Sequence, residues 1–122
     1  MADKKYTLAE ANALLPYVAP TLVELREKFE EAVKIRELVA QAATTNGGSS
    51  QRDQWQETLG RVGELLGRLD EWEIVLRDVS TGLIDFPTMI DGDDAFLCWR
   101  LGEAEVGYWH STEEGFSSRK PL

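Results

Sequence analysis

Five residues in the last third of the chain have side chains that could bind a small ligand. Asp85, Cys98, Arg100 and Glu105 lie in three short segments that we expect to be neighbouring β-strands, and Trp109 follows in the last segment. Small-molecule sites commonly combine apolar walls with a few placed polar groups, so these five are candidate ligand-binding residues. The alternative is a solvated sheet face with a weak Arg100–Glu105 cross-strand ion pair. No catalytic residue is identified.

The same region holds two residues of the types that bind zinc, Cys98 and His110, with Asp85 and Glu103 nearby in the sequence. Zinc sites in proteins use three or four such ligands in tetrahedral geometry. The spacing Cys-x11-His matches no standard zinc pattern, and the strand pairing given below puts the two residues on opposite faces. We therefore expect no metal, with Cys98 and His110 as the candidates if one binds. We expect Cys98 to be a buried, unreactive thiol.

The change of face also argues against a nucleophilic Cys98–His110 pair, for which no third member is visible. The sequence therefore identifies no cofactor and leaves open whether the protein is an enzyme.

Three strands are expected to position these residues, at 83–86, 95–100 and 105–110, where the hydrophobic period changes to two. Asp91-Gly92 is a strong signal for a two-residue hairpin loop, and we take Gly102-Glu103 as the next loop. Loop length fixes the register of a hairpin. The first loop then pairs Ile84 with Trp99, Asp85 with Cys98, and Phe86 with Leu97. The second pairs Trp99 with Val106, Cys98 with Gly107, Leu97 with Tyr108, and Arg100 with Glu105.

These pairings sort the sheet into two faces. The apolar face is expected to pack on helices, and the opposite face carries the polar candidates. The expected apolar residues are Ile84, Phe86, Leu97, Trp99, Val106 and Tyr108.

The preceding part of the chain has helical periodicity. Thr7 and Glu10 form a capping box, which predicts a short helix at 8–15 that Pro16 interrupts. Apolar residues then recur every three or four positions over 17–43 and again over 52–79. The polar, glycine-containing stretch between them predicts an antiparallel helical hairpin.

The expected fold class is therefore α+β. A long antiparallel two-helix hairpin, with a short N-terminal helix, packs on a small three-stranded antiparallel β-sheet. We expect a single domain over 1–122, with the hairpin in 1–79 and a β-meander and C-terminal tail in 80–122.

Composition restricts the partners and the location. The chain has 22 acidic and 13 basic residues, a net charge of −9 that repels nucleic acid and anionic membranes. Its single cysteine, the lack of a secretory signal and the lack of a membrane span favour the cytoplasm. Apolar residues outside the hairpin seam, such as Val23, Leu38 and Leu65, favour a homodimer.

Several motifs resemble one known family. These are the run Gly82 to Pro87, the run Cys98 to Glu103, Tyr108-Trp109-His110, Gly115-Phe116 with Arg119, and the opening Tyr6 to Asn12. Over essentially the whole chain they are similar to the bacterial domain of unknown function 2203. The resemblance implies a small, intracellular bacterial protein. It implies no activity, substrate or catalytic residue.

The function expected from the sequence is a non-enzymatic binding or interaction module that self-associates through its helices. The alternative is an enzyme, dependent on a metal or small ligand, that uses the polar face of the sheet. The ligand, the pathway, the oligomer order and the presence of a pocket are not specified by the sequence.

Overall fold

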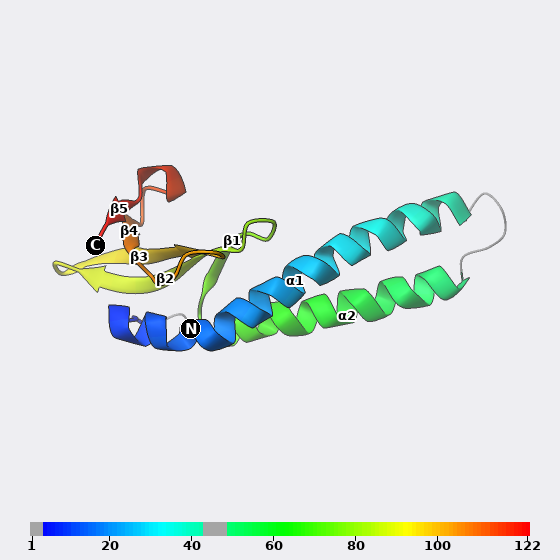
Figure 1. Ribbon diagram of the computed structural model, residues 1–122, viewed down its shortest axis with the longest axis horizontal. Coiled ribbons are helices and arrows are strands. Elements are labelled where there is room, and N and C mark those ends of the chain that lie inside the picture. The colour runs from blue at the N-terminus through cyan, green and yellow to red at the C-terminus, as the bar shows by residue number, and fades with distance from the viewer. Residues whose placement is uncertain (1–3, 43–48) are drawn as a thin grey trace.

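The computed structural model describes residues 4–42 and 49–122. In this part of the chain two α-helices, α1 (Leu8–Ala42) and α2 (Ser49–Glu71), precede a five-stranded antiparallel sheet. The expected α+β class and the helical hairpin are confirmed. The hairpin extends away from one end of the sheet (Figure 1). Neither helix, over the described residues, is long and apolar enough to cross a membrane.

Helix α1 begins at the predicted capping box. The Thr7 amide donates to Glu10 Oε1 at 2.9 Å, and the Glu10 amide donates to Thr7 Oγ1 at 3.1 Å. The predicted break at Pro16 is wrong, because α1 continues through Pro16 and Pro20 to Ala42, and no separate short helix precedes it in the described residues. Its first turns lie along the sheet and its later turns lie along α2 (Figure 1).

Burial explains why the prolines do not end α1. An internal proline costs about 3 kcal/mol, whereas a fully buried Val or Leu contributes about 1.5–3 kcal/mol. Leu15, Val18, Leu22 and Leu25 flank the prolines and are all buried in the core. Their combined burial outweighs the helix-breaking tendency.

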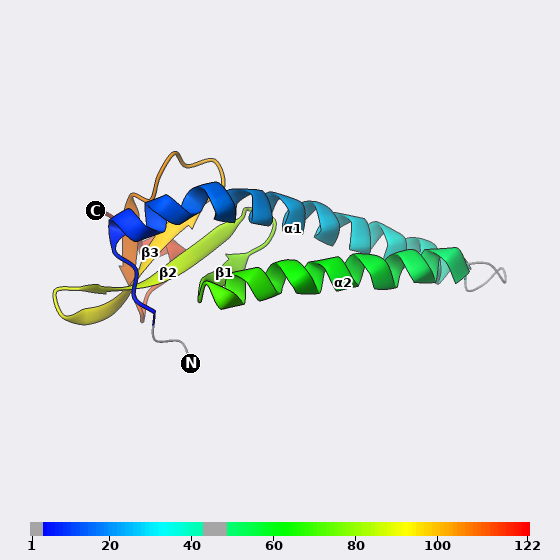
Figure 2. The same cartoon turned by 90° about the horizontal axis from the view of Figure 1, so that it is seen from below.

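Helix α2 packs antiparallel to α1 (Figure 2). Its buried residues Thr58, Val62 and Leu65 face the hairpin partner, and Arg61 donates to Glu24 on α1 through Nε at 2.6 Å and Nη2 at 2.7 Å. The predicted extension of α2 to residue 79 is wrong, since the helix ends at Glu71.

A Schellman-type cap ends α2. The Ile74 amide donates to the Leu69 carbonyl at 3.0 Å, and the Glu73 amide donates to the Asp70 carbonyl at 2.9 Å. Glu73 has φ 58, the left-handed conformation that glycine usually supplies at this position. Leu69 and Ile74 are both buried in the core and add the apolar contact of this motif.

The sheet is a meander in the order β1 (Val75–Asp78), β2 (Leu83–Ile90), β3 (Asp93–Arg100), β4 (Tyr108–Ser111), β5 (Lys120–Pro121). The predicted count of three strands is wrong. Strand β1 lies in the segment that the sequence assigned to the second helix. Strand β5 has two residues and follows a short 3-10 helix, η1 (Phe116–Ser118).

The β2–β3 register is as predicted. Ile84 pairs with Trp99, Asp85 with Cys98, and Phe86 with Leu97. The loop residues Asp91 and Gly92 have φ 52 and 85, as a two-residue type I′ turn requires.

The β3–β4 register differs by one residue from the prediction. Leu97 pairs with Trp109 and Cys98 pairs with Tyr108. A turn does form, since the Glu103 amide donates to the Arg100 carbonyl at 3.1 Å, but strand pairing resumes only at Tyr108. The connection 101–107 is held to α1 by the buried Val106, whose amide donates to Asn12 Oδ1 at 2.7 Å.

A one-residue slip moves every side chain of a strand to the other face. Trp109 therefore packs against the core beside Leu97, whereas Tyr108 and His110 lie on the outer face with Cys98. The core-facing residues of β2 and β3 are as predicted, namely Ile84, Phe86, Leu97 and Trp99.

Candidate metal centre

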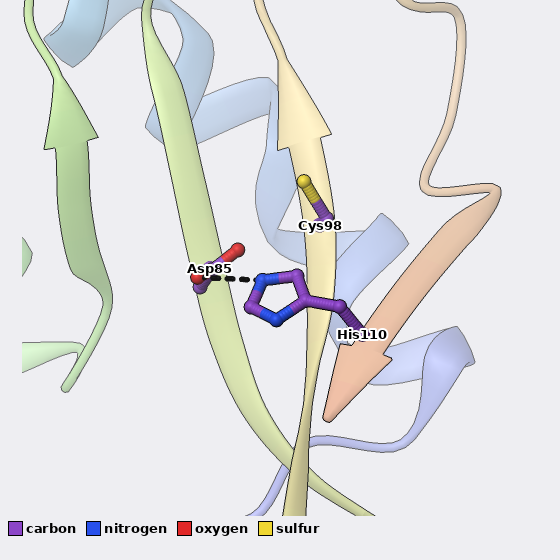
Figure 3. A group of neighbouring side chains, drawn as sticks. All are labelled: Asp85, Cys98 and His110. Carbon is purple, nitrogen blue, oxygen red and sulfur yellow. Dashed lines mark hydrogen bonds and ion pairs between the residues drawn. The ribbon is translucent and has the colours of Figure 1, made fainter. Parts of the chain in front are cut away.

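Three adjacent strands bring three potential metal ligands together on the outer face of the sheet. Asp85 comes from β2, Cys98 from β3 and His110 from β4 (Figure 3). Their exposed fractions are 1%, 0% and 2%. One ligand atom from each lies within 4.8 Å of the other two. The predicted separation of Cys98 from His110 is wrong, because it depended on the incorrect β4 register.

The His110 ring is fixed by two acceptors. Its Nδ1 lies 2.8 Å from the carbonyl oxygen of Ser111, and its Nε2 lies 2.9 Å from Asp85 Oδ2. A carbonyl oxygen only accepts, so Nδ1 carries a hydrogen. Nε2 is therefore the ring nitrogen that faces the carboxylate and is left for a metal ion. A metal-binding histidine has this arrangement, with the far ring nitrogen donating to a carbonyl or carboxylate.

The Asp85 carboxylate is buried and only half satisfied. Its Oδ2 accepts from Arg77 Nε at 2.7 Å and faces His110. Its Oδ1 is buried with no hydrogen-bond partner among the described residues. A buried acceptor without a partner costs about 1–3 kcal/mol, and more when it is charged. Coordination of a cation by Oδ1 would remove this cost.

Cys98 is not arranged as a nucleophile. Burial raises the pKa of its thiol to about 11, and the charge of Asp85 contributes in the same direction. Both nitrogens of His110 face other acceptors, so the ring is not placed as a base for the sulfur. A buried thiol beside a carboxylate and an imidazole is instead a donor set that suits a transition metal.

A cleft of about 230 Å³ opens next to these residues. Asp85 and His110 form part of its wall, together with Arg77 and Phe116. Arg77 is 44% exposed and its guanidinium lies 5.1 Å from the centre of the Phe96 ring. Asp85 and His110 therefore border the cleft, whereas Cys98 lies behind them and is not part of its wall.

The C-terminal tail is fastened over the same face by Arg119. Its guanidinium forms two hydrogen bonds to Glu103, at 3.1 and 2.8 Å, and lies 3.9 Å from the centre of the Tyr108 ring. Burial alone would raise the pKa of Glu103, but Arg119 and the Arg100 amide outweigh burial, and this pKa lies below its usual value. Arg119 Nη1 also lies 3.9 Å from Cys98 Sγ.

Comparison with known proteins is consistent with the motifs in the sequence. The family described as "Uncharacterized conserved protein (DUF2203)" matches residues 4–122. The chain belongs to this family. The resemblance noted from the sequence motifs is thereby confirmed. No curated protein and no solved structure matches the chain.

The structure brings together only part of the predicted ligand set. Asp85 and Cys98 lie at the centre of the cluster. Arg100 borders the outer face, with its guanidinium 5.4 Å from the centre of the Phe116 ring. Glu105 is exposed in the 101–107 connection and is not paired with Arg100, which lies opposite Leu83. Trp109 lies on the helix side of the sheet.

Two residues of this candidate site were not in the predicted ligand set. His110 was considered as a metal ligand but was assigned to the face of the sheet opposite Cys98. The observed 101–107 connection is longer than the predicted two-residue loop, and it places His110 on the same face as Cys98. Arg77 was assigned to a helix. The β-branched Val75 directly before Leu76 was the signal available for a strand there.

Proposed function

We propose that the protein binds a divalent transition metal ion, zinc foremost, through Asp85, Cys98 and His110. The observation that carries this proposal is the convergence of three buried donor groups, one of which has an unpartnered carboxylate oxygen. Carboxylate, thiolate and imidazole are the three zinc ligand types used in proteins. On binding, Cys98 coordinates as the thiolate and its proton passes to solvent.

The ligand geometry needs only a small adjustment. Tetrahedral zinc with bonds of about 2.0–2.3 Å holds its ligand atoms about 3.3–3.8 Å apart. The donor atoms here lie within 4.8 Å of one another. Side-chain movements that shift these atoms by about 1 Å would bring them to the distances of a zinc site. Three protein ligands leave a fourth position open, which is typical of zinc sites that bind substrate or water. The function supported best is therefore metal-dependent binding of a small ligand in the adjoining cleft, and the metal would supply a Lewis acid there.

Cobalt titration tests this function. Co²⁺ can replace Zn²⁺ in such sites and reports thiolate coordination by a charge-transfer band near the ultraviolet. We expect one equivalent of Co²⁺ to bind the wild-type protein with this band and Cys98→Ser to lose the band. His110→Gln and Asp85→Asn should each bind Co²⁺ at least tenfold more weakly. Asp93→Asn, on an exposed residue of β3, is the matched control for Asp85→Asn.

Two results would refute the proposal. One is wild-type protein that takes up no stoichiometric Co²⁺ or Zn²⁺. The other is a cobalt spectrum that is the same in wild type and Cys98→Ser, since the ion would then be bound elsewhere.

A second candidate function is self-association through the helices. Large apolar side chains stay 39–49% exposed on the hairpin, namely Phe29, Val33, Leu38, Leu59 and Leu66. A hollow of about 480 Å³ with Phe29, Val33 and Val79 in its walls lies against α1. A second copy of the chain would offer the same apolar side chains and complete a four-helix bundle. Light scattering at several concentrations distinguishes a dimer from a strict monomer.

A further inference from the structure

Resting on the proposed metal site, we infer that the cleft beside it takes a small oxyanion, a carboxylate or a phosphate, held between the metal and Arg77. The argument uses the placement of Arg77, the charge of the loaded site and the size of the cleft.

Arg77 is aimed at the site by a β-bulge. In the β1–β2 ladder, Leu76 pairs with Ile84 and Asp78 pairs with Leu83, so Arg77 has no partner position. A bulge of this kind redirects a side chain and is frequent beside functional sites. Here it accompanies a guanidinium whose Nε lies 2.7 Å from the carboxylate of Asp85.

The outer edge of the Arg77 guanidinium is free. Only Nε has a hydrogen-bond partner among the described residues, and the side chain is 44% exposed. The Phe96 ring supports the guanidinium at 5.1 Å. The two Nη groups can therefore donate in parallel to a planar carboxylate or to a phosphate, the geometry for which arginine is suited.

The charge of the loaded site favours an anion. A divalent ion contributes +2, Asp85 and thiolate Cys98 contribute −1 each, and Arg77 contributes +1, which leaves +1. Glu114 also lines the cleft, but it accepts from Ser111 Oγ at 3.1 Å and lies 3.8 Å from Lys120. The chain as a whole has a net charge of −9 and repels anions. Anion binding would therefore depend on the positive charge of the metal ion and Arg77 at the site.

The size of the cleft limits the ligand. Its volume is about 230 Å³, and a water molecule occupies about 30 Å³ in the liquid. A phosphate or a short carboxylic acid fits within this space.

The experiment uses the cobalt-loaded protein with inorganic phosphate and acetate as probes. An anion at the open position changes the visible d–d absorption of Co²⁺, so its affinity can be titrated. We expect at least one probe to bind the wild type and Arg77→Gln to weaken it at least tenfold, with partial recovery in Arg77→Lys. Each variant is saturated with cobalt before the anion titration, because Arg77 also donates to the ligand Asp85 and its substitution should weaken cobalt binding. Arg36→Gln, on an exposed residue of α1, is the matched control.

The outcomes separate this inference from the proposed function. Cobalt that binds with thiolate character but responds to neither probe overturns the anion site and leaves the metal site standing. Equal anion affinity in wild type and Arg77→Gln also overturns it. Absence of stoichiometric cobalt binding refutes the metal site and the anion site with it. Circular dichroism of Arg77→Gln and Arg77→Lys shows whether both variants remain folded.

Discussion

The Ser111 carbonyl limits the chemistry open to His110. Because it occupies Nδ1 at 2.8 Å, only Nε2 remains for a proton, a carboxylate or a metal ion. Nε2 faces Asp85, so His110 is not available to activate Cys98. This single backbone contact makes coordination a better interpretation of the cluster than nucleophilic catalysis.

The Glu103–Arg119 pair gives a prediction at the same scale. Both side chains are largely buried, with 18% and 14% exposed. Glu103→Gln should lower the free energy of unfolding at pH 7 by about 1.5–3 kcal/mol, the range for hydrogen bonds to charged groups. Urea denaturation measures this, and Glu105→Gln, on an exposed residue, is the control expected to have little effect.

The effect of Glu103→Gln should depend on pH. The pKa of Glu103 is lower in the folded protein than its ordinary value of about 4.5, because the hydrogen bonds from Arg119 and the Arg100 amide outweigh the effect of burial. The stabilisation is therefore fully present above about pH 4.5 and is lost as the pH falls through the folded pKa. This account would be contradicted if the wild type and Glu103→Gln differed in free energy of unfolding as much in strong acid as at pH 7.

Among the elements, the β2–β3 hairpin is the one whose structure is determined most directly by residues close in sequence. Asp91 and Gly92 both adopt positive φ, and this turn fixes which face Asp85 and Cys98 share. Gly92→Ala should destabilise the protein by about 1–2 kcal/mol, because a Cβ disfavours the left-handed region. No neighbour lies within 4 Å of the Cβ position, so strain in the backbone is the only cause.

Gly60→Ala in α2 is the matched comparison. It also meets nothing within 4 Å, but its backbone is helical, so alanine should stabilise the protein by about 1 kcal/mol. Thermal unfolding of both variants should therefore shift the midpoint in opposite directions. A Gly92→Ala variant as stable as wild type would show that the turn does not need positive φ.

The elements that sequence patterns missed lack such local signals. The cap that follows α2 has Glu73 in a conformation that glycine usually adopts. No residue type in the sequence therefore marked the end of the helix. The β3–β4 connection depends on Val106 and its contact with Asn12, a contact distant in sequence. The place of His110 in the site follows from that connection and could not be predicted from sequence spacing alone. The pairing of Asp85 with Cys98 could be predicted, because the Asp91-Gly92 turn fixes it.

At the scale of the whole molecule, the metal site and the apolar helix surface are separate. The site lies on the face of the sheet away from the helices, and the hairpin extends beyond one end of the sheet (Figures 1 and 3). A second copy could therefore pack on the helices without covering Asp85, Cys98 or His110. Metal binding and self-association should respond to different substitutions.

Leu66→Glu tests this separation. Leu66 is 39% exposed on α2, and a charge there should disfavour an apolar interface and shift a dimer toward monomer in light scattering. Metal affinity should not change. Gln54→Glu adds the same charge on another face of α2, beside the polar groove that contains Thr58 and Arg61, and should leave the oligomeric state as in wild type. A monomeric wild type at high concentration would contradict the helix interface.

X-ray absorption at the zinc edge tests the central claim most directly, because it counts the ligands of the bound ion. For the zinc-loaded wild type we expect one sulfur at about 2.3 Å together with nitrogen and oxygen ligands at about 2.0–2.1 Å. Cys98→Ser should lose the sulfur. A shell of nitrogen and oxygen alone in the wild type, or failure of the wild type to retain zinc, would contradict a metal centre at Asp85, Cys98 and His110.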